Sequence, residues 1–281
     1  MMNNLLKEIR IFHWIKNLLI FAPLIFACSF FDITLIFQAI LGFFAFSFIA
    51  SVVYVLNDVC DIEKDKLHPQ KKNRPIASGK ISMTMAKVLG TILITIGIFL
   101  SFHLPFDFQI ILGIYFIFNI LYSFWLKHIV SIDIISVALM YLFRIFAGAA
   151  IVGVRVSSWM LLTTFFGALF LVVAKRYSEL KNQTLSRNIL EHYQKEMLEL
   201  FMGISTTLTI VFYCLYVVEK SPNFIFTIPI VLFGIFRYYY LVFYHGKGEE
   251  PEKLLFDPAV FLSGILWILV SILILSIQGN F

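Results

Sequence analysis

The polar segment 57–79 separates two long apolar runs and holds the residues of this chain best suited to chemistry. It reads NDVCDIEKDKLHPQKKNRPIASG, with aspartates Asp58, Asp61 and Asp65 spaced by three and four residues. If the preceding apolar helix continues through them, their carboxylates fall within an arc of roughly 60° on one helix face. Mg²⁺ binds one or two carboxylates and completes its coordination with water and phosphate oxygens. The spacing therefore predicts a site for Mg²⁺ and a diphosphate, to which Asn57 can add an amide oxygen.

Basic residues follow these acids directly. Lys71, Lys72 and Arg74 are expected to contact phosphate oxygens, the arginine through two parallel hydrogen bonds. Pro69 and Pro75 break the helix and let the loop fold back. The alternative is a solvated loop of mixed charge. The shared face of the acids, followed at once by cations, favours the diphosphate site over that alternative.

The composition indicates a protein that lies in a membrane. Hydrophobic residues make up 60% of the chain and charged residues 14%. Apolar runs of about 18 or more residues, long enough to span a bilayer as helices, recur along the whole length. We therefore expect an all-α polytopic membrane protein and not a β-barrel, which shows short alternating segments instead. A single domain is expected over residues 1–281. The nine expected spans are 14–31, 34–56, 85–104, 108–126, 130–152, 157–174, 200–218, 223–244 and 258–277.

The distribution of positive charge predicts the orientation of these spans. The chain has 22 lysines and arginines, and the loops on one side hold only Arg155 and Lys220 of them. Positive residues favour cytoplasmic loops, so we expect a protein of the cell (inner) membrane with its N-terminus, its polar loops and a cavity facing the cytoplasm. The net charge of +5 is then mainly a topology signal, and nucleic-acid binding is not expected. The expected cytoplasmic segments are 1–13, 57–84, the region around residue 127, 175–199 and 245–257.

One arginine lies well inside an expected span. Arg144 stands between Phe143 and Ile145 in the span 130–152. A charge within the bilayer is costly and normally faces a cavity or a partner of opposite charge. Contact with the phosphate or sugar of a substrate is one interpretation. The other is a structural pair with Asp133, which would have to bridge about 16 Å along a straight helix.

The pattern N-D-x-x-D-x-x-x-D at residues 57–65, between the second and third expected spans, resembles the first aspartate-rich motif of the UbiA superfamily of intramembrane prenyltransferases. The resemblance covers nearly the whole chain. It implies nine transmembrane helices around a central cavity open to the cytoplasm, and a motif that holds Mg²⁺ as cofactor together with a diphosphate. Superfamily members often carry a tyrosine and a lysine at the end of the fourth span, where this chain has Tyr122 and Lys127. Substrate contact and membrane anchoring both stay open for this lysine.

The loop after the sixth expected span departs from the aromatic prenyltransferases of that superfamily. Those enzymes carry a second motif, D-x-x-x-D, whereas residues 174–180 of this chain read AKRYSEL. Lys175 and Arg176 could be simple positive anchors at the membrane surface. The contiguous string, however, resembles the polyprenyl-phosphate (decaprenyl-phosphate) phosphoribosyltransferase branch. Further matches to that branch are Trp14-x-Lys16-Asn17, residues 65–79, Leu142-x-Arg144-x-x-Ala147-Gly148 and Pro251-Glu252.

This second resemblance implies transfer of 5-phosphoribose from phosphoribosyl pyrophosphate to a polyprenyl phosphate lipid in the bilayer. Lys71 and Arg74 would neutralise charge on the departing pyrophosphate, and Tyr177 and Glu179 would hold ribose hydroxyls or a second ion. The expected metal ligands are Asp58, Asp61 and Asp65. The residues expected to be catalytic are Asp58, Asp61, Asp65, Arg144, Lys175, Tyr177 and Glu179. Those expected to bind substrate are Lys16, Asn57, Lys71, Arg74, Tyr122, Lys127 and Arg176.

Three other functions are compatible with parts of this pattern. The first is an aromatic (4-hydroxybenzoate-type) polyprenyltransferase using a prenyl diphosphate, which the missing second aspartate motif disfavours. The second is a transporter with a divalent-cation site, which would distribute charges through several spans instead of gathering them on one side. The third is a non-catalytic scaffold, which would not need acids on one helix face. Homo-oligomer formation stays open.

Overall fold

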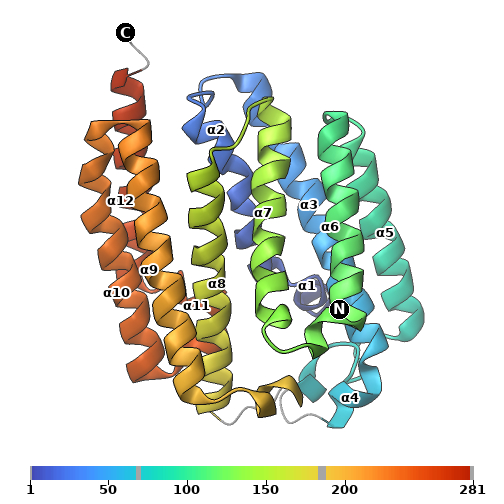
Figure 1. Ribbon diagram of the computed structural model, residues 1–281. Helices are drawn as coiled ribbons and strands as arrows, with labels where there is room; N and C mark the ends of the chain where they lie inside the picture. The colour runs from blue at the N-terminus through green and yellow to red at the C-terminus, as the bar shows by residue number, and fades with distance from the viewer. Residues whose placement is uncertain (1, 68–70, 183–187, 279–281) are drawn as a thin grey trace. The chain divides into compact units, whose positions relative to one another are not determined.

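The computed structural model of the chain describes residues 2–67, 71–182 and 188–278 (Figure 1). All regular structure within these ranges is helical. Pro69, one of the two prolines expected to end the first polar helix, lies outside the described residues. The chain divides into two compact units, each described here by itself. Unit 1 comprises Met1–Leu24, Ser29–Trp125 and Phe143–Val154, and unit 2 comprises Ile25–Cys28, Leu126–Leu142 and Arg155–Phe281.

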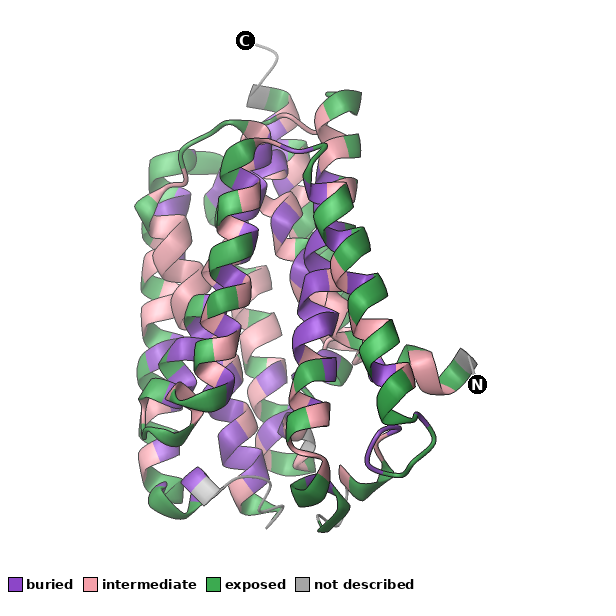
Figure 2. Cartoon of the chain, turned by 90° about the vertical axis from the view of Figure 1, so that its right-hand side faces the viewer, coloured by how far each residue is buried: buried purple, intermediate pink, exposed green. Residues whose placement is uncertain are grey.

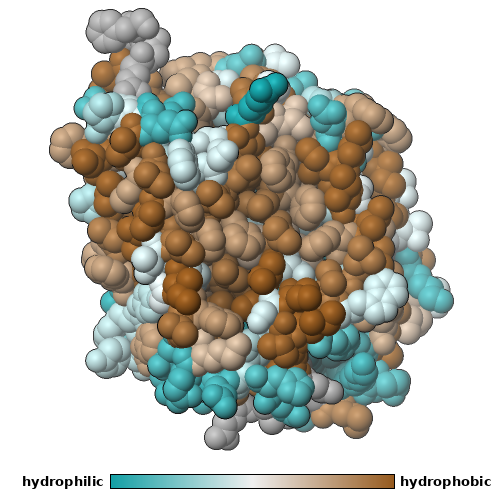
Figure 3. All heavy atoms as spheres, viewed as in Figure 1, coloured by the Kyte–Doolittle hydropathy of each residue, from teal (hydrophilic) through white to brown (hydrophobic). Residues whose placement is uncertain are grey.

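Eight of the described helices are long and apolar enough to cross a membrane. They correspond to eight of the nine expected spans, and apolar side chains cover their middle parts while hydrophilic residues gather toward their ends (Figure 3). Large apolar side chains such as Phe99, Phe236 and Leu269 are exposed, which is expected of helices that face lipid and not water. The chain is therefore an all-α integral membrane protein. The eight candidate spans are Ile33–Cys60, Met83–Ser101, Phe106–His128, Ile132–Val152, Ser158–Lys181, Lys195–Lys220, Pro222–His245 and Pro258–Ile277.

Unit 1 is built around α3 (Ile33–Cys60), the longest of the described helices, whose most apolar part is largely buried (Figure 2). The carboxylate of Asp32 caps its first turn by accepting hydrogen bonds from the backbone N–H groups of Thr34 and Leu35, at 2.8 and 3.2 Å. α5 packs along α3 and is mainly exposed on its other face. The elements of this unit are α1 (Met2–Glu8), η1 (Ile11–Phe21), α3 (Ile33–Cys60), α4 (Ile62–Leu67), η2 (Lys71–Asn73), α5 (Met83–Ser101), α6 (Phe106–Phe124), the first residues of α2 (Ala22–Phe26) and the second half of α7 (Ile132–Val152).

The first expected span, 14–31, is a shorter apolar segment in the structure. Residues 11–26 form a 3₁₀ helix, η1, followed directly by the short α2. Pro23 has no backbone N–H, so a single α-helical hydrogen-bond ladder cannot run through this segment. The side chains of Trp14 and Asn17 fix η1 to α3, through hydrogen bonds of 3.0 and 2.9 Å to serine hydroxyls.

Unit 2 is a bundle in which α8 packs along α9, and α10 along α12. Its core includes Tyr177, Leu198 and Val242, all of which are buried. Gly248 permits η6 to approach α8, because a Cβ atom there would lie 2.2 Å from the hydroxyl of Ser178. The elements of this unit are η3 (Leu126–His128), the first half of α7, α8 (Ser158–Lys181), η4 (Asn188–His192), α9 (Lys195–Lys220), η5 (Pro222–Thr227), α10 (Ile228–His245), η6 (Lys247–Glu249), α11 (Pro251–Leu254) and α12 (Pro258–Gln278).

Candidate active site

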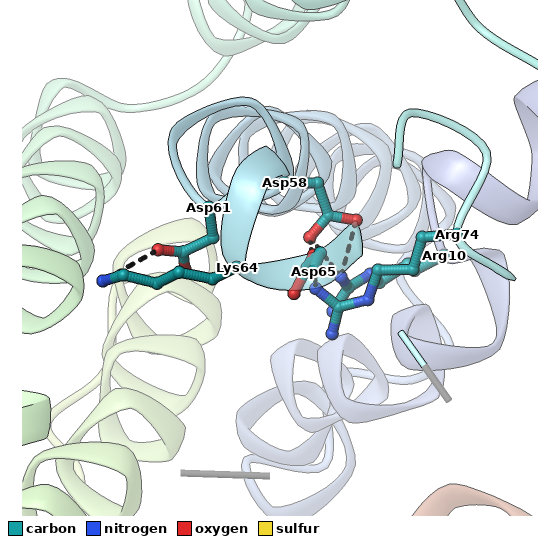
Figure 4. Close-up of polar contacts among 6 residues, drawn as sticks. All are labelled: Arg10, Asp58, Asp61, Lys64, Asp65 and Arg74. Carbon is teal, nitrogen blue, oxygen red and sulfur yellow. Dashed lines mark hydrogen bonds and ion pairs between the residues drawn. The ribbon is translucent and has the colours of Figure 1, made fainter. Parts of the chain in front are cut away.

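Two aspartates of the first polar segment converge on one arginine in unit 1 (Figure 4). Nη1 of Arg74 donates to Oδ1 of Asp58 at 2.9 Å and to Oδ2 of Asp65 at 2.6 Å. Nη2 of Arg10 donates to both oxygens of Asp58, at 2.7 and 2.9 Å. Asp58 and Asp65 are almost completely buried. We call Arg10, Asp58, Asp65 and Arg74 the first cluster.

The third aspartate points elsewhere, which corrects the expected single face. α3 ends at Cys60, Asp61 has φ −97° and ψ 11°, and the new helix α4 begins at Ile62. Its carboxylate lies 3.9 Å from Nζ of Lys64 and is turned away from Asp58 (Figure 4). The backbone N–H of Asp61 still donates to the carbonyl of Asn57 at 2.9 Å. The chain therefore changes direction without losing its helical backbone hydrogen bonds. This change of direction lets α4 carry its own aspartate to Arg74.

A further buried carboxyl group lies beside this cluster and was missed by the sequence reasoning. Glu8, the last residue of α1, is 1% exposed. Burial and the negative charge of Asp58 together raise the pKa of Glu8 to about 7, against the opposing charges of Arg10 and Arg74. Burial alone would lower the pKa of Arg10, but the charge of Asp58 and its hydrogen bond, together with Tyr54 and Glu8, outweigh burial and raise the pKa above its ordinary value. Nothing in the spacing of residues 1–13 distinguishes Glu8 and Arg10 from ordinary charged residues beside a membrane span.

The donor set of the first cluster suits a divalent cation. Among the residues that the structure describes, no three His, Cys, Asp or Glu side chains are arranged to hold a metal ion. Nevertheless Asp58 and Asp65 already direct one oxygen each at a single positively charged nitrogen. Carboxylates that converge on one cation can hold Mg²⁺ once the guanidinium groups move to another anion. The residues present therefore fit Mg²⁺.

Residues 174–180, expected as a loop, belong to the last turns of α8 and contribute to a second buried cluster, in unit 2. Nε of Arg176 donates to Oδ2 of Asp133 at 3.2 Å, and its Nη1 donates to Oε2 of Glu179 at 2.7 Å. The hydroxyl of Tyr193 donates to the other oxygen of Asp133 at 2.6 Å. Arg176 and Asp133 are 2% and 0% exposed, so this ion pair is internal to the protein. The alternative pairing of Asp133 with Arg144 is therefore wrong.

Arg144 belongs to a separate network in unit 1. Its Nε donates to Oδ1 of Asn17 at 2.7 Å, and its Nη2 lies 3.4 Å from the hydroxyl of Tyr115. The guanidinium group also lies over the rings of Phe46 and Tyr115, 5.3 Å from each centroid. The partners of this intramembrane charge come from η1, α3 and α6. The network explains how the charge is tolerated, and its predicted contact with substrate stays a prediction.

The sequence and the fold of this chain match those of known proteins. The family model for the UbiA prenyltransferase family matches residues 18–274. The chain belongs to the UbiA prenyltransferase family. Its UbiA fold is also that of a solved UbiA homolog from Archaeoglobus fulgidus bound to GPP and Mg²⁺, with a TM-score of 0.73, 20% identity, and coverage of 97% of this chain and 99% of the other.

Curated UbiA relatives match over most of the chain. A decaprenyl-phosphate phosphoribosyltransferase of Mycobacterium tuberculosis is 30% identical over 93% of this chain and 91% of its own length. One of Corynebacterium glutamicum is 30% identical over 99% of this chain and 89% of its own length. The UbiA protein described here is accordingly a transferase.

The remaining predicted residues of this UbiA protein are distributed over both units. Tyr177 is 1% exposed, and its ring lies 5.0 Å from that of Phe243 and 5.8 Å from Nζ of Lys195. The structure brings Asp58 and Asp65 together with Arg74, and Glu179 together with Arg176. The predicted residues that are half-buried outside the two clusters are Lys16, Asn57, Lys71, Tyr122, Lys127 and Lys175.

Proposed function

We propose that this UbiA protein transfers 5-phosphoribose from phosphoribosyl pyrophosphate to a polyprenyl phosphate of the decaprenyl type, with Mg²⁺, and releases pyrophosphate. The observation that carries the proposal is the second cluster, in which Arg176 binds both Asp133 and Glu179. Where an aromatic prenyltransferase would have paired aspartates for a second metal ion, this chain has an internal arginine that binds two carboxylates. The names of the curated relatives, at 30% identity over more than nine tenths of the chain, support the same reaction.

The first cluster provides the groups that a diphosphate donor requires. Mg²⁺ held by Asp58 and Asp65, and by Asp61 once its side chain has turned from Lys64 toward them, would offset the negative charge of the pyrophosphate. Arg10 and Arg74, which neutralise the aspartates in this structure, would turn to the pyrophosphate oxygens as the cation takes their place. Guanidinium groups donate paired hydrogen bonds to phosphate, so they would stabilise the leaving group as its charge develops.

The chemical step itself asks little of an acid or base. The bond between C1 of ribose and the pyrophosphate oxygen breaks, and pyrophosphate leaves with the electron pair through an oxocarbenium-like state. A phosphate oxygen of the lipid forms the new bond to C1. That oxygen is already an anion, so no general base has to remove a proton. Lys175 is proposed to reduce the repulsion between the two anionic substrates, and Tyr177 is proposed to bind ribose hydroxyls.

The orientation follows the distribution of charge. We propose that the N-terminus and the loops after α3 and α8 face the cytoplasm, where a water-soluble sugar diphosphate is available. The lipid chain would lie among the apolar helices and enter from the bilayer.

Pyrophosphate release measures this function directly. Purified protein is given Mg²⁺ with phosphoribosyl pyrophosphate and decaprenyl phosphate, and in parallel with a prenyl diphosphate and 4-hydroxybenzoate. We expect release with the first pair only, and loss of release when either substrate is omitted. Release with the second pair only would overturn the proposal in favour of aromatic prenylation.

A further inference from the structure

Glu8 is a buried carboxylate that the reaction proposed above does not use. It is 1% exposed, and neither of its oxygens has a hydrogen-bond donor in the structure. A buried carboxylate without a hydrogen-bond donor is costly, and side chains of this kind are rarely kept without a role. Its neighbour is another carboxyl group, that of Asp58.

The charges around Glu8 do not balance. Three carboxylates, those of Glu8, Asp58 and Asp65, lie near two guanidinium groups, those of Arg10 and Arg74. Both arginines direct their hydrogen bonds at the aspartates. The group therefore has one more negative than positive charge when all five are ionised, and the carboxylate left without a donor is that of Glu8.

A divalent cation would correct this imbalance. It would bring two positive charges to the carboxylates and leave the guanidinium groups for an anion. Oxygen ligands are the ones that Mg²⁺ prefers, and it usually keeps several water molecules that themselves need hydrogen-bond acceptors. A buried carboxylate without a donor satisfies either requirement.

We propose that Glu8 is a fourth carboxylate of the cation site, which binds the divalent ion directly or accepts a hydrogen bond from one of its water molecules. The inference rests on the proposed placement of Mg²⁺ at the first cluster. It extends that site to α1, 50 positions before Asp58, and assigns this short helix a part in holding the ion.

The test measures cation binding without any substrate. Mn²⁺, a paramagnetic substitute for Mg²⁺, is titrated into detergent-solubilised protein and the free ion is measured by electron paramagnetic resonance. The matched control to Glu8→Gln is Glu63→Gln on α4, since Glu63 is 79% exposed and bonded to Lys66. We expect Glu8→Gln to weaken Mn²⁺ binding about 10- to 100-fold, as loss of a supporting metal-site group does, and Glu63→Gln to change it less than about twofold.

Each outcome separates the inference from the proposed function. If Glu8→Gln binds Mn²⁺ as tightly as the native protein while Asp58→Asn does not, the inference is wrong and the metal site stands. If the native protein binds no Mn²⁺, both fail. Thermal unfolding without metal shows whether Glu8→Gln is folded, and glutamine can donate to Asp58 as a neutral glutamate would. Should it not fold, Glu8→Asp decides, because a shortened side chain must weaken a metal contact, and unchanged affinity would overturn the inference.

Discussion

Arg10 holds Asp58 through two hydrogen bonds from Nη2, 2.7 Å to Oδ1 and 2.9 Å to Oδ2, across 48 positions of sequence. The pair joins the N-terminal segment to the end of α3. It keeps the first aspartate of the motif in place and neutralised. We infer that the N-terminal segment is part of the diphosphate site and not only an entry into the membrane.

The coupling between these two residues is measurable. Arg10→Ala, Asp58→Ala and the double variant form a thermodynamic cycle in the free energy of unfolding in detergent. Each single substitution leaves the other residue without its charge partner. We therefore expect the double variant to lose about 0.5–3 kcal/mol less unfolding free energy than the two single variants lose together. Additive effects would contradict the direct contact.

Asp61 offers a test of function that leaves the fold intact. Its contact with Lys64 is 3.9 Å long and partly exposed, and such pairs contribute little to stability. We therefore expect Asp61→Asn to have the same unfolding temperature as the native protein but to lose transferase activity. Glu63→Gln, at an exposed position of α4 two residues after Asp61, serves as the control and should keep its activity. Native activity in Asp61→Asn would contradict its place among the metal ligands.

Gly148 is required by the close approach of η1. A Cβ atom at this position would lie 2.1 Å from the carbonyl oxygen of Ile20, a backbone atom that cannot turn aside. We expect Gly148→Ala to destabilise the protein by about 1–3 kcal/mol, as overpacking does. At Gly113 a Cβ atom meets nothing within 4 Å, so Gly113→Ala should be neutral or slightly stabilising. Equal unfolding temperatures for the two variants would contradict the close packing.

Tyr193 supports the second cluster. Its hydroxyl donates to Asp133 at 2.6 Å and accepts from the backbone N–H of Ser131 at 2.8 Å. Tyr193→Phe removes both bonds at a buried charge, so we expect it to lower the free energy of unfolding by about 1.5–3 kcal/mol. Tyr244 is 79% exposed, and Tyr244→Phe is the matched control with no expected effect. A native unfolding curve for Tyr193→Phe would show that the cluster does not depend on it.

Hydropathy was sufficient to predict the eight long helices, because each needs only an apolar run of bilayer length. It predicted the first span, 14–31, as too long. Pro23, which interrupts the helix, can be read from the sequence, but the close contact between Ile20 and Gly148 is a tertiary feature that a window of apolar residues does not contain. The periodicity of the first motif predicted a shared face, and the break at Asp61 overrode it.

Partners distant in sequence were the least predictable part of the site. Asp58 was identified from its spacing to the other acids, but its partner Arg10 looks like any basic residue beside a membrane span. Asp133 was considered for Arg144 because both lie on α7, whereas the fold gives it Arg176 from α8. Only the packing of the helices decides such pairs.

The most direct test of the account is the mass of the lipid product. Decaprenyl phosphate is incubated with the purified protein, Mg²⁺ and phosphoribosyl pyrophosphate, and the extracted lipid is analysed by mass spectrometry with and without EDTA. We predict that the lipid gains one phosphoribosyl group, and that chelation of the metal prevents the gain. Unchanged lipid in the presence of Mg²⁺, from protein that prenylates 4-hydroxybenzoate with a prenyl diphosphate, would contradict the account.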